Sequence, residues 1–120
     1  MAHRPILVVE DDRDLRDSLC GVLELEGFPT VGARNGEEAL TWLRTHPAPC
    51  AILLDLMMPV MNGLEFRTRQ LDDVALAGIP VIVLSALDDG QQKTDLRDAQ
   101  AYLKKPIEPD ALFDALRRFC

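Results

Sequence analysis

The chain has 120 residues, enough for a single hydrophobic core, which predicts one domain over residues 1–120. Asp and Glu outnumber Lys and Arg by 20 to 13, giving a net charge of −7 at pH 7. Because proteins bind nucleic-acid backbones through clustered cations, this balance argues against direct nucleic-acid binding. Three pairs of arginines are interpreted as solvated helix faces: Arg13/Arg16, Arg67/Arg69 and Arg117/Arg118.

The cysteines and the apolar runs indicate the cellular setting. Cys20, Cys50 and Cys120 are odd in number and scattered, which predicts neither a disulfide framework nor a zinc site. The apolar run after the first five residues spans only Ile6–Val9, too short for a signal peptide, and no window reaches the length of a membrane span. We therefore expect a soluble protein of the reducing cytoplasm, without a membrane partner.

The first part of the chain predicts two strands and a helix. Residues 6–9 form a short apolar run rich in β-branched residues, typical of a strand buried on both faces of a parallel sheet. Residues 30–33 are a weaker strand candidate. Between them, Gly27 is placed to end a helix whose apolar residues recur at helical spacing: Leu15, Leu19, Val22 and Leu23.

The alternation of helix and strand continues to residue 120. Asn35, with Glu38 three residues on, predicts the start of a second helix, which Pro47 limits. Two more apolar runs, residues 51–54 and 81–84, predict buried strands. The remaining elements are two helices, a polar segment of uncertain structure and a weaker strand, at Leu64–Leu71, Asp110–Phe119 with Pro109 in its first turn, Asp88–Gln100 and residues 101–104.

This order of elements predicts an α/β fold with a doubly wound parallel sheet of about five strands. Ligands of such sheets bind beyond the carboxyl ends of the strands. Charged and hydroxyl side chains follow four of the predicted strands: Glu10, Asp11 and Asp12, then Asp55, then Ser85, and last Lys105 with Pro106. The sequence therefore predicts one polar crevice at this edge of the sheet.

The residue types in the crevice indicate phosphoryl transfer. Carboxylates in close contact repel one another unless a cation neutralises them, and Mg²⁺ prefers oxygen ligands. A carboxylate beside Mg²⁺ can attack phosphorus, while Ser and Lys donate to the oxygens of the transferred group. Asp55 is the predicted acceptor, with Ser85 and Lys105 as donors. For Asp12, a place at the start of the following helix is favoured over a ligand role.

As a set, these residues resemble those of the receiver domain of bacterial two-component response regulators, of the chemotaxis type, over essentially the whole chain. The matching stretches are Val8–Asp12, Leu54–Pro59 with Asn62–Gly63, Ile79–Pro80 leading to Leu84–Ala86, and Tyr102–Pro106. The resemblance implies a flavodoxin-like sheet with strand order 2-1-3-4-5.

The resemblance also implies a role for each site residue. Asp55 would be the phospho-acceptor and would bind Mg²⁺, or Mn²⁺ in its place, together with Asp11, Glu10 through water, and the backbone carbonyl of Met57. Ser85 and Lys105 would contact the phosphoryl group, Tyr102 would change rotamer on activation, and the Lys105–Pro106 bond would be cis. For Tyr102, a plain half-buried strand aromatic is the alternative.

The implied function is a phosphorelay switch. A histidine kinase or histidine phosphotransfer protein would donate the phosphoryl group. The fourth helix of the family corresponds to the uncertain segment Asp88–Gln100, and the fifth helix to Asp110–Phe119. The surface of these two helices and the fifth strand would then bind an unidentified protein and would allow a homodimer. Such a protein is not an enzyme for external substrates, since a phosphohydrolase needs a second carboxylate near the nucleophile and position 57 is Met.

Two alternatives concern other functions. A phosphorylation-independent interaction module with the same fold would not need all five of Glu10, Asp11, Asp55, Ser85 and Lys105. A nucleotide- or flavin-binding protein would need a glycine-rich loop after the first strand, where this chain has acids. The sequence is compatible with a stand-alone relay protein or with a part of a longer regulator.

Overall fold

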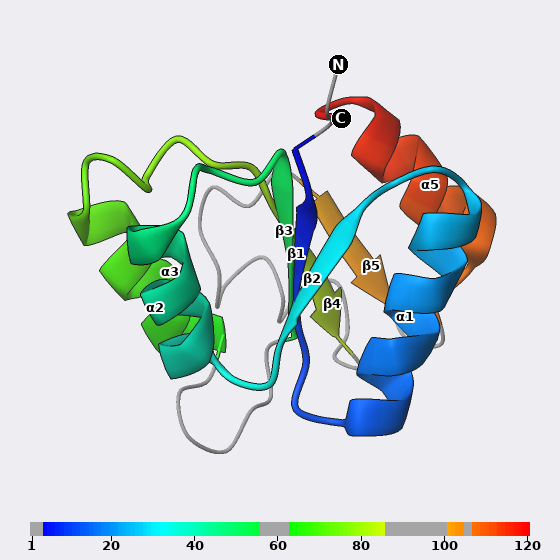
Figure 1. Ribbon diagram of the computed structural model, residues 1–120, viewed down its shortest axis with the longest axis horizontal. Coiled ribbons are helices and arrows are strands. Elements are labelled where there is room, and N and C mark those ends of the chain that lie inside the picture. The colour runs from blue at the N-terminus through cyan, green and yellow to red at the C-terminus, as the bar shows by residue number, and fades with distance from the viewer. Residues whose placement is uncertain (1–3, 56–62, 86–100, 105–106) are drawn as a thin grey trace.

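The computed structural model describes residues 4–55, 63–85, 101–104 and 107–120, and Figure 1 shows how their helices and strands are arranged. In chain order the elements are β1 (Ile6–Val9), α1 (Arg13–Leu25), β2 (Thr30–Ala33), α2 (Gly36–Thr45), β3 (Ala51–Asp55), α3 (Gly63–Asp72), β4 (Val81–Ser85), β5 (Ala101–Lys104) and α5 (Pro109–Arg117). The polar segment Asp88–Gln100 lies outside the described residues.

The five strands form one parallel sheet in the order β2-β1-β3-β4-β5, which confirms the predicted fold class and strand order. The central strands β1 and β3 are fully buried, as their unbroken apolar runs predicted. Val9 pairs with Leu54 in their register. The next residue of each strand, Glu10 and Asp55, therefore emerges at the same point of the carboxyl edge.

Helices cover both faces of the sheet, with α2 and α3 on one side and α1 and α5 on the other (Figure 1). Because successive strand residues face opposite sides, the central strands β1 and β3 supply both cores. Leu7 and Leu54 pack in the core under α2 and α3, while Val8 and Leu53 pack in the core under α1 and α5. These two apolar layers hold the carboxyl edge of the sheet in place.

The helix ends agree with the sequence signals. The Asp12 carboxylate accepts a hydrogen bond from the backbone N–H of Leu15 (3.2 Å) and so begins α1. Gly27 follows α1 with a φ of 93°, a conformation that favours glycine. Asn35 caps α2 by accepting from the Glu38 N–H at 2.8 Å. The expected role of Asp12 at a helix start is confirmed.

The absence of a disulfide, expected from the cysteine pattern, is wrong. Cys50 and Cys120 form a disulfide with a Cα–Cα distance of 5.5 Å and a sequence separation of 70. Cys50 directly precedes β3 and Cys120 follows α5, and only the completed fold brings these two positions together. Cys20 remains a free, half-buried thiol, and burial raises its pKa.

The interpretation of the arginine pairs needs a correction on α3. Arg69 lies on the surface beside Glu65 (3.5 Å), as expected. Arg67, however, is only 3% exposed and donates to the Gln70 side-chain oxygen at 2.8 Å. Phe66, Arg67 and Gln70 share the inner side of α3 at helical spacing, so the sequence neighbours Arg67 and Arg69 face in different directions.

The described helices have lengths of 9 to 13 residues. Within the described ranges, none is long and apolar enough to cross a membrane.

Candidate metal and phospho-acceptor site

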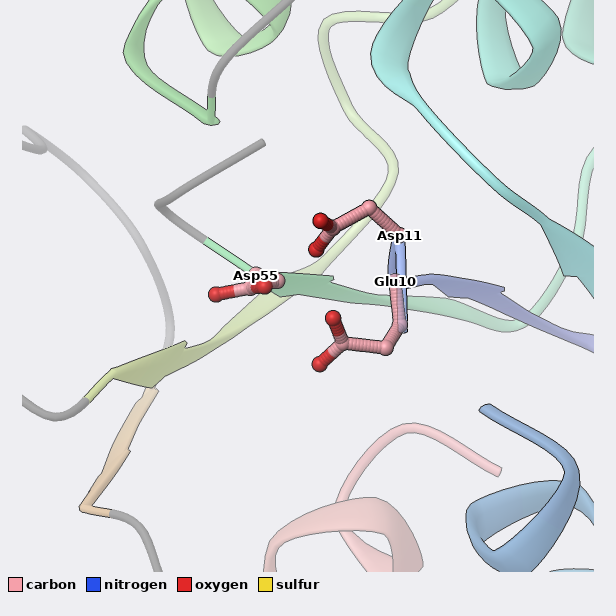
Figure 2. A group of neighbouring side chains, drawn as sticks. All are labelled: Glu10, Asp11 and Asp55. Carbon is pink, nitrogen blue, oxygen red and sulfur yellow. The ribbon is translucent and has the colours of Figure 1, made fainter. Parts of the chain in front are cut away.

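Three carboxylates gather at the carboxyl edge of the two central strands. Glu10 and Asp11 directly follow β1, and Asp55 is the last residue of β3. One oxygen of each lies within 4.8 Å of the others. Figure 2 shows Glu10 and Asp11 turning their carboxylates to the side on which Asp55 lies. The fold thus brings together three of the predicted site residues from two separate segments.

The cluster is buried on one side and open on the other. Glu10 is 1% exposed and Asp55 is 3% exposed, whereas Asp11 is exposed. The pKa of Glu10 is raised to about 7, mainly by burial and also by the neighbouring Asp55 and Asp11 carboxyls, against the effect of a hydrogen bond from the Asp12 N–H. Neutralising this group by a cation would therefore be favourable.

The donor set fits a small divalent cation. Carboxylate oxygens are hard ligands, and Mg²⁺ is usually held by one or two carboxylates while it keeps several waters. Asp11 provides a carboxylate on the solvent side, where such waters have room. The oxygens of Glu10, Asp11 and Asp55 lie within 4.8 Å of one another, so a cation bound between them would offset the repulsion of their charges.

A set of hydrogen bonds holds the acidic segment after β1. The Glu10 N–H donates to the Ala33 carbonyl (3.0 Å), and the Asp12 N–H donates to Glu10 Oε2 (3.2 Å). Arg16 reaches back from α1, and its Nη1 donates to the Glu10 carbonyl at 2.8 Å. Glu10 is therefore fixed through its amide, its carbonyl and its side chain.

The interpretation of Arg16 as part of a solvated helix face is wrong, because Arg16 is half-buried and bonded to the site. A sequence signal for this position exists. Arg16 lies three residues before Leu19 and seven before Leu23, the two buried residues of α1, and so shares their side of the helix. Arg13 is exposed, as expected, and its Nε is 3.9 Å from Asp17.

The backbone places two further predicted residues on the neighbouring strands β4 and β5. Leu84 pairs with Asp55 across β4 and β3, so Ser85 is the next residue toward the carboxyl edge. Tyr102 pairs with Val83, is half-buried, and packs against the core on the α2 and α3 side. Met57, Lys105 and Pro106 lie outside the described residues, so their roles stay predictions.

Comparison with known proteins identifies the class to which this fold and carboxylate cluster belong. The family model of the response regulator receiver domain matches residues 6–117. The chain belongs to this family, the phospho-accepting receiver domains of two-component signal transduction.

Among curated proteins, the chain is 38% identical over 121 residues to the DNA-binding response regulator MtrA of Mycobacterium tuberculosis, covering 93% of this chain and 48% of that protein. It is 38% identical over 116 residues to the phosphate regulon transcriptional regulatory protein PhoB of Klebsiella pneumoniae, covering 93% of this chain and 49% of that protein. The chain thus spans about half the length of these relatives.

Solved structures show the same fold. The chemotaxis protein CheY4 of Vibrio cholerae superposes with a TM-score of 0.90 at 26% identity, covering 99% of this chain and all of that one. A putative response regulator of Chloroflexus aurantiacus gives a TM-score of 0.91 at 28% identity, covering 98% of each chain. The expected family and fold are confirmed.

Proposed function

We propose that Asp55 accepts a phosphoryl group from a histidine kinase or a histidine phosphotransfer protein in a reaction that needs Mg²⁺. The observation that carries this proposal is the cluster of Glu10, Asp11 and Asp55 at the carboxyl edge of β1 and β3, in a chain of the receiver family. Mn²⁺ would substitute for Mg²⁺, since the ligands are all oxygens.

The residues of the chain have distinct parts in the proposed reaction. Asp11 and Asp55 would hold the cation directly and Glu10 through water, and the backbone carbonyl of Met57, which lies outside the described residues, would be the remaining protein ligand. When bound, the cation neutralises charge on the phosphoryl oxygens. A carboxylate oxygen of Asp55 attacks the phosphorus while the bond from phosphorus to the donor's histidine nitrogen breaks, and that nitrogen keeps the electron pair. Ser85 and Lys105 donate to the phosphoryl oxygens.

The proposed output is a shift in the populations of two conformations of the partner-binding surface. Phosphorylation adds nearly two negative charges and new acceptor oxygens at Asp55. Ser85 moves toward them, and the ring of Tyr102 turns into the space that is left. The half-buried position of Tyr102 beside the core supports this role. The surface of β5, α5 and the segment Asp88–Gln100, where the fourth helix is expected and which lies outside the described residues, would then bind a downstream protein or a second copy of the chain.

The proposal assigns residues 1–120 to one receiver domain that acts in the cytoplasm. This domain accepts a phosphoryl group, hydrolyses only its own aspartyl phosphate and converts no external substrate. Two relatives are named as DNA-binding or transcriptional regulators, and the chain spans about half of each. We assign no nucleic-acid contact to this domain, because its net charge is −7.

Intact-mass measurement after incubation with Mg²⁺ and acetyl phosphate tests the proposal. The wild type should gain one phosphoryl group, and Asp55→Asn should gain none. If the wild type binds Mg²⁺ but gains no phosphoryl group, the alternative of a phosphorylation-independent interaction module is favoured.

A further inference from the structure

Arg16 connects α1 to the acidic segment of the site. It lies in the second turn of α1 and is half-buried. Its Nη1 donates to the Glu10 carbonyl oxygen at 2.8 Å, a short hydrogen bond from a charged donor. That carbonyl belongs to the planar peptide unit between Glu10 and Asp11. Arg16 therefore acts on one of the two peptide units that flank the Asp11 Cα and so helps to set the direction of the Asp11 side chain.

Gly32 provides the space that the Arg16 side chain crosses. Gly32 lies on β2 opposite Val8 of β1. A Cβ atom at position 32 would lie 3.1 Å from Arg16 Cδ, closer than ordinary van der Waals contact, and 3.4 Å from Arg16 Cγ. The φ angle of Gly32 is not in the left-handed region, so the backbone itself does not require glycine there. The contribution of Gly32 is its lack of a side chain, which leaves space for Arg16.

The acidic segment is thus held from two elements. β2 holds the Glu10 amide through Ala33, and α1 holds the Glu10 carbonyl through Arg16. Arg13, one turn earlier on α1, makes a contrasting contact. Its Nε lies 3.9 Å from Asp17, and both side chains are well exposed. The two arginines carry the same charge near the same end of the sheet, but only Arg16 contacts the segment that bears Glu10 and Asp11.

We propose that Arg16 is a positioning residue for the cation site and that Gly32 is needed for Arg16 to take this position. Arg16 orients the Glu10–Asp11 peptide so that both carboxylates face Asp55, and Gly32 leaves room for the arginine to do so. This inference rests on the proposed function, since it assumes that the three carboxylates bind a divalent cation. It adds a requirement that lies outside the carboxylate cluster.

Mn²⁺ binding to the full chain tests the role of Arg16. We would titrate Mn²⁺ alone, detected by electron paramagnetic resonance, into the wild type, Arg16→Met, Arg16→Lys and Arg13→Met. Arg16→Met should weaken Mn²⁺ binding by about tenfold, as loss of partners that orient metal ligands does. Arg16→Lys keeps a charged donor and should recover part of the loss. Arg13→Met removes the same charge and should leave the affinity unchanged.

The outcomes separate this inference from the proposed function. If the wild type does not bind Mn²⁺, the proposed function fails. If the wild type binds Mn²⁺ and Arg16→Met binds equally well, only the role of Arg16 is overturned. Equal losses for Arg13→Met and Arg16→Met would also overturn it, because the effect would then be one of net charge.

A double-mutant cycle of Gly32→Ala and Arg16→Met tests whether Gly32 acts through Arg16. Gly32→Ala should weaken Mn²⁺ binding in the wild type, because the added Cβ displaces Arg16. The same substitution should have no further effect in Arg16→Met. Gly21→Ala is the matched control, since a Cβ at position 21 would meet no atom within 4 Å. Equal losses from Gly32→Ala in both backgrounds would show that the two residues act separately and would overturn the proposal.

Discussion

Glu10 and Asp55 stand side by side because Val9 pairs with Leu54 in the register of β1 and β3. Both carboxyls are almost fully buried, at 1% and 3% exposure. Two acids in this position lower the stability of the metal-free protein once both are charged. This loss of stability is inherent in a site that gathers negative charges to bind a cation.

The first prediction concerns the pH dependence of the metal-free protein. The pKa of Glu10 is raised from 4.5 to about 7, so the folded state holds a proton that the unfolded state has lost across this interval. The free energy of unfolding should therefore fall as pH rises from 4.5 to 7, by about 3 kcal/mol from this group. Glu10→Gln should lack the decrease. The free energy of unfolding of Glu10→Gln minus that of the wild type should therefore be larger at pH 8 than at pH 5.

Urea unfolding in the presence of EDTA measures this difference. Glu37→Gln changes the same charge on the exposed surface of α2 and serves as the matched control. Curves for the wild type and Glu10→Gln that stay parallel from pH 5 to pH 8 would contradict the assigned effect of burial on Glu10.

The second prediction concerns the disulfide. Cys50 and Cys120 close a loop with a sequence separation of 70. Cross-links of this span restrict the unfolded chain and stabilise a fold by up to about 4 kcal/mol. Cys50→Ser with Cys120→Ser should lower the free energy of unfolding accordingly, and a thiol reductant should destabilise the wild type but not this double variant. Cys20→Ser is the control, and it should keep the sensitivity to reductant. Reductant-insensitive unfolding of the oxidised wild type would contradict the account.

The third prediction concerns the buried amide of Gln70 on α3. Its Nε2 donates to the carbonyls of Leu76 and Ile79, at 2.9 and 3.1 Å, and its oxygen accepts from Arg67. Gln70→Leu leaves these groups without the amide and should lower the free energy of unfolding by about 3 kcal/mol or more. Thr68→Val, at an exposed position of the same helix, should cost much less. Equal effects in denaturant titrations would count against the role of Gln70.

The fourth prediction concerns Tyr102 as a switch. Beryllofluoride, a mimic of the phosphoryl group, should change hydrogen exchange in β5 and α5 of the wild type. Tyr102→Ala removes the ring that is proposed to move, so it should lose the change in α5 while still binding the mimic. Tyr102→Phe keeps the ring and should keep most of the response. An unaltered response in Tyr102→Ala would leave Tyr102 as a structural residue of β5.

The sequence predicted the fold through local patterns that agree with one another. The unbroken apolar runs at β1, β3 and β4 mark strands covered on both faces, and the Asn35 cap marks a helix start. Parallel topology then carries Glu10, Asp11 and Asp55 to one edge of the sheet, which is why the cluster was foreseeable.

Other features depend on contacts between distant parts of the chain. The Cys50–Cys120 pair has no signal in cysteine spacing, because it arises from the meeting of the start of β3 with the end of α5. Arg67 looks like a surface residue until the inner side of α3 is known. The contact from Arg16 to Glu10 needs the close approach of α1 to β2 at Gly32.

The most direct test of the central claim is to locate the phosphoryl group. After incubation with Mg²⁺ and acetyl phosphate, borohydride reduction would convert an aspartyl phosphate to homoserine, and peptide mass spectrometry would identify its position. We predict homoserine at residue 55 alone, dependent on Mg²⁺ and reduced in Asp11→Asn. Homoserine at another aspartate, or equal labelling of Asp55→Asn, would contradict the assignment of Asp55 as the phospho-acceptor.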